Sequence, residues 1–226
     1  MTSALGGSTW PEVADRAAAL LAVPLGSLEQ HGPHLPLDTD TRIAVALAAA
    51  LAAARPDVVV APAVAYGASG EHAAFPGTLS IGTAALTTVL VELGRSADVF
   101  TGVVFVNGHG GNLDAVRAAA STLSGEGRRV LAWSPSVPGG DAHAGRTETS
   151  ILLALDPSCV RLDRAAPGAT APLPELIGEL RRGGVAAVAA NGVLGDPAGA
   201  SAAEGHDLLA QLGDALRIAV DARFGR

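Results

Sequence analysis

Carboxylate and imidazole side chains gather at three places in the sequence, and both types bind divalent metal ions. The first place holds Glu29 and His31, followed by Asp38 and Asp40. Residues two apart on an extended segment point to the same side, so Glu29 and His31 can present an oxygen and a nitrogen to adjacent ions. Two ions roughly 3.5–4 Å apart also need a bridging carboxylate, for which Asp38 and Asp40 are both candidates. The alternative explanation for this segment is an ordinary polar loop.

The second place is the segment 107–112, Asn-Gly-His-Gly-Gly-Asn, in which His109 stands between glycines. Glycine lets the backbone approach a ligand closely, which suits an imidazole that contacts a metal ion or a substrate. A glycine-rich phosphate loop at a helix N-terminus is the competing interpretation. It fits less well, because the segment matches neither common phosphate-loop pattern and the chain has no lysine to reach a phosphate.

The third place is the segment His-Ala-Gly-Arg-Thr-Glu, which runs from His143 to Glu148. On a helix that begins near Gly145, Glu148 falls in the first turn, where the helix dipole favours a carboxylate. Each residue alone has a simpler explanation, since Glu148 can be a capping partner and His143 an ordinary turn residue. The third segment therefore indicates a metal or catalytic site only in combination with the other two.

Short β-branched segments alternate with longer helical patterns along the chain, which predicts the α/β class with a mostly parallel sheet covered by helices on both faces. Asn112 is expected to cap the helix after segment 107–112, and Thr39 or Asp40 the helix after the first strand. Strands are expected at 21–25, 57–64, 101–106 and 129–134, and helices near Pro11, at 41–54, from 83, from 113, at 147–155 and at 207–223.

Most histidines follow predicted strands. In open α/β sheets, ligands bind outside the carboxyl ends of the strands, so these loops are expected to converge on one crevice. The long loop 66–82 also carries Glu71, and loops of this length are usually functional or disordered. His206 is expected at a helix start or on the surface. The histidines in loops after strands are His31, His34, His72, His109 and His143.

Composition excludes several classes of protein. The chain has 226 residues, 49% of them hydrophobic, with a net charge of −7, which predicts one folded domain over 1–226 and argues against disorder. The acidic balance argues against a nucleic-acid partner. The longest apolar stretch, 43–54, is shorter than the roughly 18 residues that indicate a membrane span. The N-terminus lacks the basic start of a signal peptide, so we expect a cytoplasmic location. Cys159 is the single cysteine and has no disulfide partner within the chain.

The combined motifs resemble those of the creatininase (creatinine amidohydrolase) family, in the family's order, at 26–40, 71–80, 107–112 and 143–150. Within the family, the chain is most similar to the peptidases of the mycofactocin system, which trim a modified precursor peptide. The resemblance implies a metal-dependent amidohydrolase on a three-layer α/β/α fold. It also implies a homo-oligomer, often a hexamer.

The resemblance further implies two divalent metal ions, for which zinc, iron and manganese are the candidates. Glu29 and His109 would bind one ion, His31 the other, and Asp40 both. Creatininase itself carries a metal-binding glutamate two residues after the histidine of segment 107–112. This chain has Gly111 at that position.

Glu148 would take the ligand place that Gly111 leaves vacant. His143 would act as the catalytic partner that stabilises the oxyanion or protonates the leaving amine. The nucleophile would come from solvent, because a bound divalent ion can lower the pKa of water to about 7. The residues expected to shape the substrate pocket are Glu71, His72, Asn107, Gly110 and Gly111.

The leading hypothesis from sequence is release of the modified C-terminal dipeptide from the mycofactocin precursor peptide. The nearest alternative is hydrolysis of a small cyclic amide such as creatinine, or of a pyrimidine formamide. Gly111 counts against creatinine but does not exclude the formamide. A metal-free nucleotide-binding or scaffold module is the alternative from another class, and metal content distinguishes it from the hydrolases.

Overall fold

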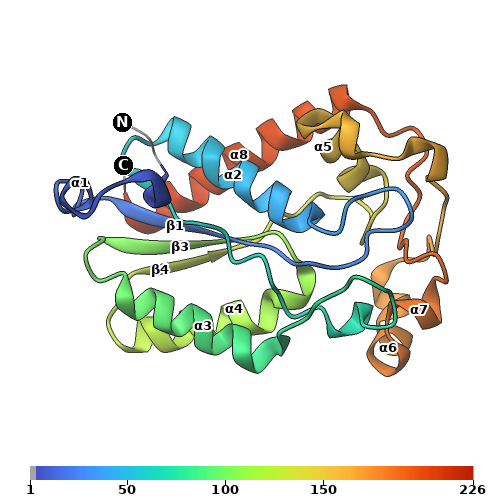
Figure 1. The fold of residues 1–226 in the computed structure, drawn as a ribbon, viewed down its shortest axis with the longest axis horizontal. Coiled ribbons are helices and arrows are strands. Elements are labelled where there is room, and N and C mark those ends of the chain that lie inside the picture. Colours follow the sequence, from blue (N-terminus) through green and yellow to red (C-terminus); the bar gives the residue numbers. More distant parts are fainter. Residues whose placement is uncertain (1–3, 226) are drawn as a thin grey trace.

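The computed structural model describes residues 4–225, and in this part of the chain four parallel strands lie between two layers of helices (Figure 1). The strand order is β2-β1-β3-β4. This arrangement confirms the predicted α/β class and its three layers. The strands are β1 (Leu20–Leu25), β2 (Val58–Val60), β3 (Gly102–Asn107) and β4 (Val130–Trp133).

Helices cover both faces of the sheet (Figure 1). One layer consists of α2 (Thr39–Ala54), α5 (Arg146–Leu155) and α8 (Ala202–Phe224), and the other of α3 (Gly82–Ser96) and α4 (Leu113–Gly125). No helix in the described part of the chain is long and apolar enough to cross a membrane. The short helices are α1 (Trp10–Ala14), α6 (Leu173–Gly183) and α7 (Val185–Val188), with 3₁₀ turns η1 (Leu5–Gly7), η2 (Gly70–His72), η3 (Gly110–Asn112), η4 (Pro157–Cys159) and η5 (Leu162–Arg164).

The apolar character of β1 on both faces explains why the sheet is buried between the two layers. Leu20 and Ala22 pack in the cluster of α2, α5 and α8, whereas Leu21, Val23 and Leu25 pack in the cluster of α3 and α4. Successive side chains of a strand point to opposite faces, so a strand that is apolar throughout needs cover on both sides. The loops that follow the strands are then left to carry the polar residues.

Several predicted boundaries are wrong by a few residues, each for a local reason. The strand predicted at 57–64 ends at Val60, because the pairing with β1 then shifts by one residue: Val60 pairs with Ala22, whereas Leu25 pairs with Val64 instead of Ala63, in an isolated bridge. Helix α8 begins at Ala202 instead of 207, because the hydroxyl of Ser201 accepts a hydrogen bond from the Glu204 amide and caps it. His206 is exposed on α8, as expected.

The predicted caps of α2 and α4 are also wrong. Thr39 and Asp40 lie inside the first turn of α2, and Asn112 precedes α4 without a side-chain capping bond. The Asn112 side chain instead accepts a hydrogen bond from the Ala68 amide at 2.8 Å and donates one to the Gly26 carbonyl at 2.9 Å. It therefore ties together the loops after β1, β2 and β3, at the edge where the histidines gather.

Helices α5 and α8 approach each other most closely at Gly205, where a Cβ atom would lie 1.9 Å from the Ser150 carbonyl oxygen. We expect Gly205→Ala to lower the free energy of unfolding by roughly 1–3 kcal/mol, because the backbone of α5 must move. Gly213, in the same helix, has only the Ala50 Cβ nearby, at 3.7 Å. Gly213→Ala is therefore the control and should stabilise the protein by up to about 1 kcal/mol, since alanine favours helix. Chemical denaturation measures both, and equal effects would contradict this packing.

Candidate functional site

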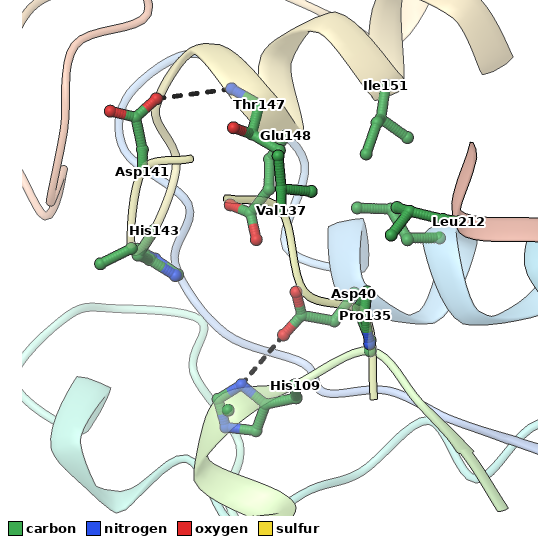
Figure 2. A pocket seen from close by; sticks show the side chains of 14 residues that line it. Asp40, His109, Pro135, Val137, Asp141, His143, Thr147, Glu148, Ile151 and Leu212 are labelled. Atoms are coloured by element: carbon green, nitrogen blue, oxygen red, sulfur yellow. Dashed lines mark hydrogen bonds and ion pairs between the residues drawn. The ribbon is translucent and has the colours of Figure 1, made fainter. Parts of the chain in front are cut away.

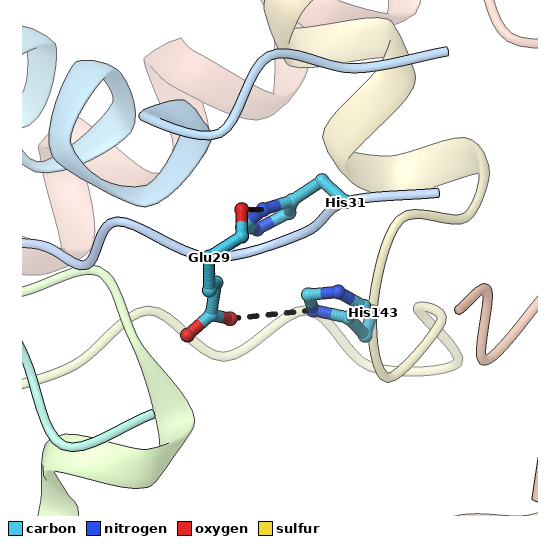
Figure 3. Close-up of side chains that lie close together, drawn as sticks. All are labelled: Glu29, His31 and His143. Atoms are coloured by element: carbon cyan, nitrogen blue, oxygen red, sulfur yellow. Dashed lines mark hydrogen bonds and ion pairs between the residues drawn. The ribbon is translucent and has the colours of Figure 1, made fainter. Parts of the chain in front are cut away.

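Six of the predicted site residues meet in one cluster at the carboxyl ends of the strands. They arrive on separate segments: the loop after β1, the first turn of α2, the loop after β3, and the segment that leads from β4 into α5 (Figures 2 and 3). Glu29 is 0% exposed and Asp40 is 2% exposed. Buried carboxylates are costly unless they are paired or bind a cation. The six residues are Glu29, His31, Asp40, His109, His143 and Glu148.

The His31 imidazole is oriented by its own loop. Its Nδ1 lies 3.1 Å from the backbone oxygen of Glu29, which can only accept, so Nδ1 carries a proton (Figure 3). Its Nε2 lies 3.0 Å from Asp40 Oδ1 and 4.0 Å from Glu148 Oε2. Metal-binding histidines usually donate their second ring N–H to a carbonyl or carboxylate in this way. His31 Nε2 and the two carboxylates thus converge as a ligand group.

The Asp40 carboxylate lies between Glu148 and His109 (Figure 2). Its Oδ1 contacts His31, while its Oδ2 lies 3.0 Å from His109 Nδ1 and accepts a hydrogen bond of 2.8 Å from the Ser27 hydroxyl. Two groups with metal-ligand spacing share this residue, one with Glu29 and His109 and the other with His31 and Glu148. Asp38, in contrast, points away and pairs with Arg42 at 2.8 Å. The geometry therefore favours Asp40 over Asp38 as the bridging candidate.

Both carboxylate oxygens of Glu29 are buried without a hydrogen bond from any described residue. The nearest nitrogens are His109 Nε2 at 3.1 Å, His72 Nε2 at 3.3 Å and His143 Nδ1 at 3.8 Å. An unsatisfied buried carboxylate is expensive, typically by several kcal/mol for a charged group. A protonated His109 offsets part of this cost, and a divalent cation bound at this carboxylate would offset more of it.

The protonation of His143 is set by the backbone of Gln30. His143 Nε2 donates to the Gln30 carbonyl oxygen at 2.8 Å, so the unprotonated Nδ1 faces Glu29 (Figure 3). The Gln30 side chain in turn contacts His72 Nδ1 at 2.8 Å and donates to the Gly192 carbonyl at 3.0 Å. Gln30 therefore positions two histidines of the site and connects them to the last third of the chain. No pattern in the sequence marked Gln30 as a site residue.

Glu148 is held by a strained turn. Ala144 adopts a left-handed backbone conformation with φ of 53°, which is uncommon for a residue other than glycine. Its amide donates a hydrogen bond of 2.6 Å to Glu148 Oε2. Glu148 thus satisfies a backbone amide at the start of α5, as the simpler explanation held, and also faces His31.

The buried carboxylates of the cluster favour the protonated, positively charged form of the two histidines beside them. Burial alone would lower the pKa of His31, but the Asp40 carboxylate outweighs it and raises the pKa to about 10. Burial likewise opposes protonation of His109, yet Asp40 and Glu29 hold its pKa well above the usual value. Burial raises the pKa of Glu148 to about 7. In the ion-free protein, two imidazolium groups therefore balance the carboxylates, and metal ions would bind with release of protons.

His72 and His143 behave differently, because burial outweighs the attraction of the carboxylates and the charge of His31 disfavours a further proton on either ring. Burial lowers the pKa of His72 to about 4. Burial, together with the charge of His31, holds the pKa of His143 well below its usual value. Both imidazoles are therefore neutral near pH 7, as a nitrogen ligand or proton acceptor must be.

The residues predicted to shape the substrate pocket lie in different places. Asn107 is buried and holds the loop, donating to the His109 carbonyl at 2.8 Å. Glu71 Oε1 lies 3.6 Å from His109 Nε2. A Cβ atom at Gly111 would lie 2.5 Å from that Glu71 oxygen and 2.4 Å from the Ala68 carbonyl oxygen, so this backbone leaves no space for a glutamate at 111. Gly110 lines the cavity beside the cluster.

This cavity has a volume of about 220 Å³ and two chemically different ends. Asp40, His109, His143 and Glu148 form the polar end, and apolar side chains form the other (Figure 2). An apolar cavity of about 150 Å³ accommodates benzene, so there is room here for a sizeable group beside the cluster. The apolar residues, which carry no chemical signal in the sequence and were not predicted, are Ile43, Val137, Ile151 and Leu212.

Ser27 is a second site residue that was not predicted from the sequence, and it is 0% exposed beside Asp40. We expect Ser27→Ala to weaken metal binding by about 10–100-fold, because partners that orient a metal ligand typically contribute this much. The affinity is measured by competition with a chromophoric chelator. Thr122→Ala, which removes an exposed hydroxyl bonded within α4, is the control and should leave the affinity unchanged. Equal affinities in all three proteins would contradict the orienting role of Ser27.

Comparisons with family models and with individual known proteins agree on one family for this chain. The family model for creatininase, creatinine amidohydrolase, matches residues 7–220. The mycofactocin precursor peptide peptidase of Mycolicibacterium smegmatis is 57% identical over 217 residues, covering 93% of this chain and 87% of that protein.

Solved creatininase structures share the fold. A creatininase with Mn superposes with a TM-score of 0.81 at 27% identity, covering 100% of both chains. A creatininase variant of the Zn-Zn type gives a TM-score of 0.81 at 26% identity, again covering 100% of both chains. The family resemblance inferred from the motifs is thus confirmed. The chain belongs to the creatininase family of metal-dependent hydrolases.

Proposed function

We propose that this protein is a dinuclear metal-dependent peptidase that releases the modified C-terminal dipeptide from the mycofactocin precursor peptide. The observation that carries the metal assignment is that Asp40 belongs to two ligand groups at once. The substrate assignment is supported by the 57% identity to a mycofactocin precursor peptide peptidase. The site residues fit two divalent cations, since buried carboxylates and oriented imidazoles converge there and Glu29 accepts no hydrogen bond from the described residues.

In this proposal, Glu29, His109 and Asp40 hold one ion, and His31, Asp40 and Glu148 hold the other. Zinc, iron and manganese all suit these ligands. When bound, such ions polarise a carbonyl group and lower the pKa of water. Three carboxylates at the site match most of the charge of two divalent ions. Assembly into a homo-oligomer, a cytoplasmic location and the single domain over 1–226 stay predictions from the sequence.

His143 is the residue proposed to move a proton. Its Nε2–H is committed to the Gln30 carbonyl, so Nδ1 is the atom that can take up a proton during hydrolysis and return it to the leaving amine. The Gln30 contacts keep the ring in this orientation. The buried apolar end of the cavity excludes water from one side of the scissile amide.

The direct test is incubation of metal-loaded protein with the modified precursor peptide, followed by mass spectrometry of the products. We expect release of the modified dipeptide and of a peptide shortened by two residues. Creatinine and a pyrimidine formamide serve as parallel substrates. Turnover of either of these without cleavage of the precursor would replace the peptidase proposal with the corresponding small-amide hydrolase.

A further inference from the structure

A second cavity lies directly beside the one at the metal-ligand cluster. Its volume is about 380 Å³, and it is lined by the loop before α5 and by the segment that leads into α8. Both cavities share Val137, Asp141 and Thr147 as lining residues. All three are half-buried, so they form a common boundary near the surface.

The first cavity is closed on its deep side. Ile43 is 4% exposed, Ile151 is 2% exposed and Leu212 is 4% exposed, and the shared boundary residue Val137 packs against the same apolar cluster on its more exposed side. Ile151 and Leu212 lie on one side of Val137 and Asp141 on the other (Figure 2). A substrate that places a group in this closed end must extend in another direction. The shared residues Val137, Asp141 and Thr147 mark the side on which the first cavity adjoins the second.

We propose that the second cavity binds the polypeptide on the N-terminal side of the scissile amide. This inference rests on the proposed peptidase function. A small amide fits entirely within the first cavity, whereas an extended chain advances about 3.3 Å per residue and leaves it after a few residues. The second cavity adjoins the first at the shared boundary residues, so a chain that leaves the first cavity there enters the second.

The chemistry of the second cavity suits a polypeptide backbone. Asp141 accepts hydrogen bonds from the amides of Arg146 and Thr147, and Arg146 pairs with Glu204 at 2.8 Å. These charges are therefore already compensated within the protein. Gly139 and Gly140 line the same cavity and are exposed, so a passing chain can approach their backbone closely.

Ala198→Trp tests this assignment. Ala198 is exposed and lines only the second of the two cavities, so a large side chain there obstructs the cavity without touching the cluster. The matched control is Ala17→Trp, because Ala17 is an exposed turn residue before β1, at the opposite end of the sheet. The substrates are the full modified precursor and a short acetylated peptide with one residue before the modified dipeptide.

We expect Ala198→Trp to raise KM for the full precursor by roughly tenfold, with KM for the short peptide unchanged, since only the longer chain reaches the obstruction. Ala17→Trp should match the wild type with both substrates. Unchanged KM for the precursor, or an equal loss with both substrates, would overturn the inference while leaving the peptidase proposal standing.

A binding measurement keeps the test independent of cleavage. The precursor lacking its last two residues is labelled with a fluorophore, and its anisotropy is followed with each metal-loaded protein. Binding that weakens in Ala198→Trp but not in Ala17→Trp supports the inference. Equal binding by all three proteins, or no binding to the wild type, overturns it. Failure of the wild type to cleave the full precursor contradicts the proposed function separately.

Discussion

Asp40→Ala is expected to remove metal from both ligand groups and to lower kcat/KM by roughly a thousandfold or more. The reason is that Asp40 contacts His31 and His109 at 3.0 Å each and is shared by both groups. Metal ions contribute several kcal/mol to catalysis, and each step of about 1.36 kcal/mol is a factor of ten in rate. Elemental analysis and peptide-cleavage kinetics measure the two effects.

Asp38→Ala is the matched control, two residues away in the sequence. The Asp38 side chain is 41% exposed and pairs with Arg42, so its loss should leave metal content and kcat/KM close to the wild-type values. Surface ion pairs of this kind contribute about 1 kcal/mol or less to stability. The reverse pattern, with metal lost from Asp38→Ala and retained in Asp40→Ala, would assign the bridge to Asp38 and contradict its assignment to Asp40.

Removal of metal by a chelator is expected to lower the melting temperature by roughly 8–16 °C for each ion lost. An ion at about a thousand times its Kd stabilises the folded state by about 4 kcal/mol, and each kcal/mol shifts the Tm of a chain of this size by roughly 2–4 °C. The physical source is the buried carboxylate of Glu29, which accepts no hydrogen bond from the described residues. Thermal unfolding with and without chelator measures the shift.

Asp40→Ala supplies the control for this thermal shift as well. If the stabilisation comes from ions in the cluster, the chelator should leave the Tm of Asp40→Ala nearly unchanged. A chelator-induced shift of the same size in this variant would locate the stabilising ions elsewhere. Re-addition of metal to the wild type should restore its original Tm.

The sequence allowed the fold class and the convergence of the histidines to be predicted, because both follow from local patterns. Apolar strands that alternate with helices determine a parallel sheet, and loops after parallel strands meet at one edge. His31, His109 and His143 are brought together for this reason, although they are far apart in the sequence. The family resemblance added the distinction between Asp38 and Asp40, which local pattern alone left open.

Features that depend on tertiary contacts were not predictable from local pattern. Gln30 contacts His143 and Gly192, which are more than a hundred residues away. Leu212 belongs to the last helix and lines the cavity only because α8 packs against α2 and α5. Asn112 and Asp40 resemble helix caps in the sequence. Their side chains have partners in other loops, which took precedence over the local capping bonds.

Anomalous X-ray scattering from crystals of the zinc-loaded protein shows directly whether two cations share Asp40. We expect two peaks at the zinc absorption edge, one among Glu29, Asp40 and His109 and one among His31, Asp40 and Glu148. No peak within the cluster, or a peak pair in which only one ion contacts Asp40, would contradict the sharing of Asp40.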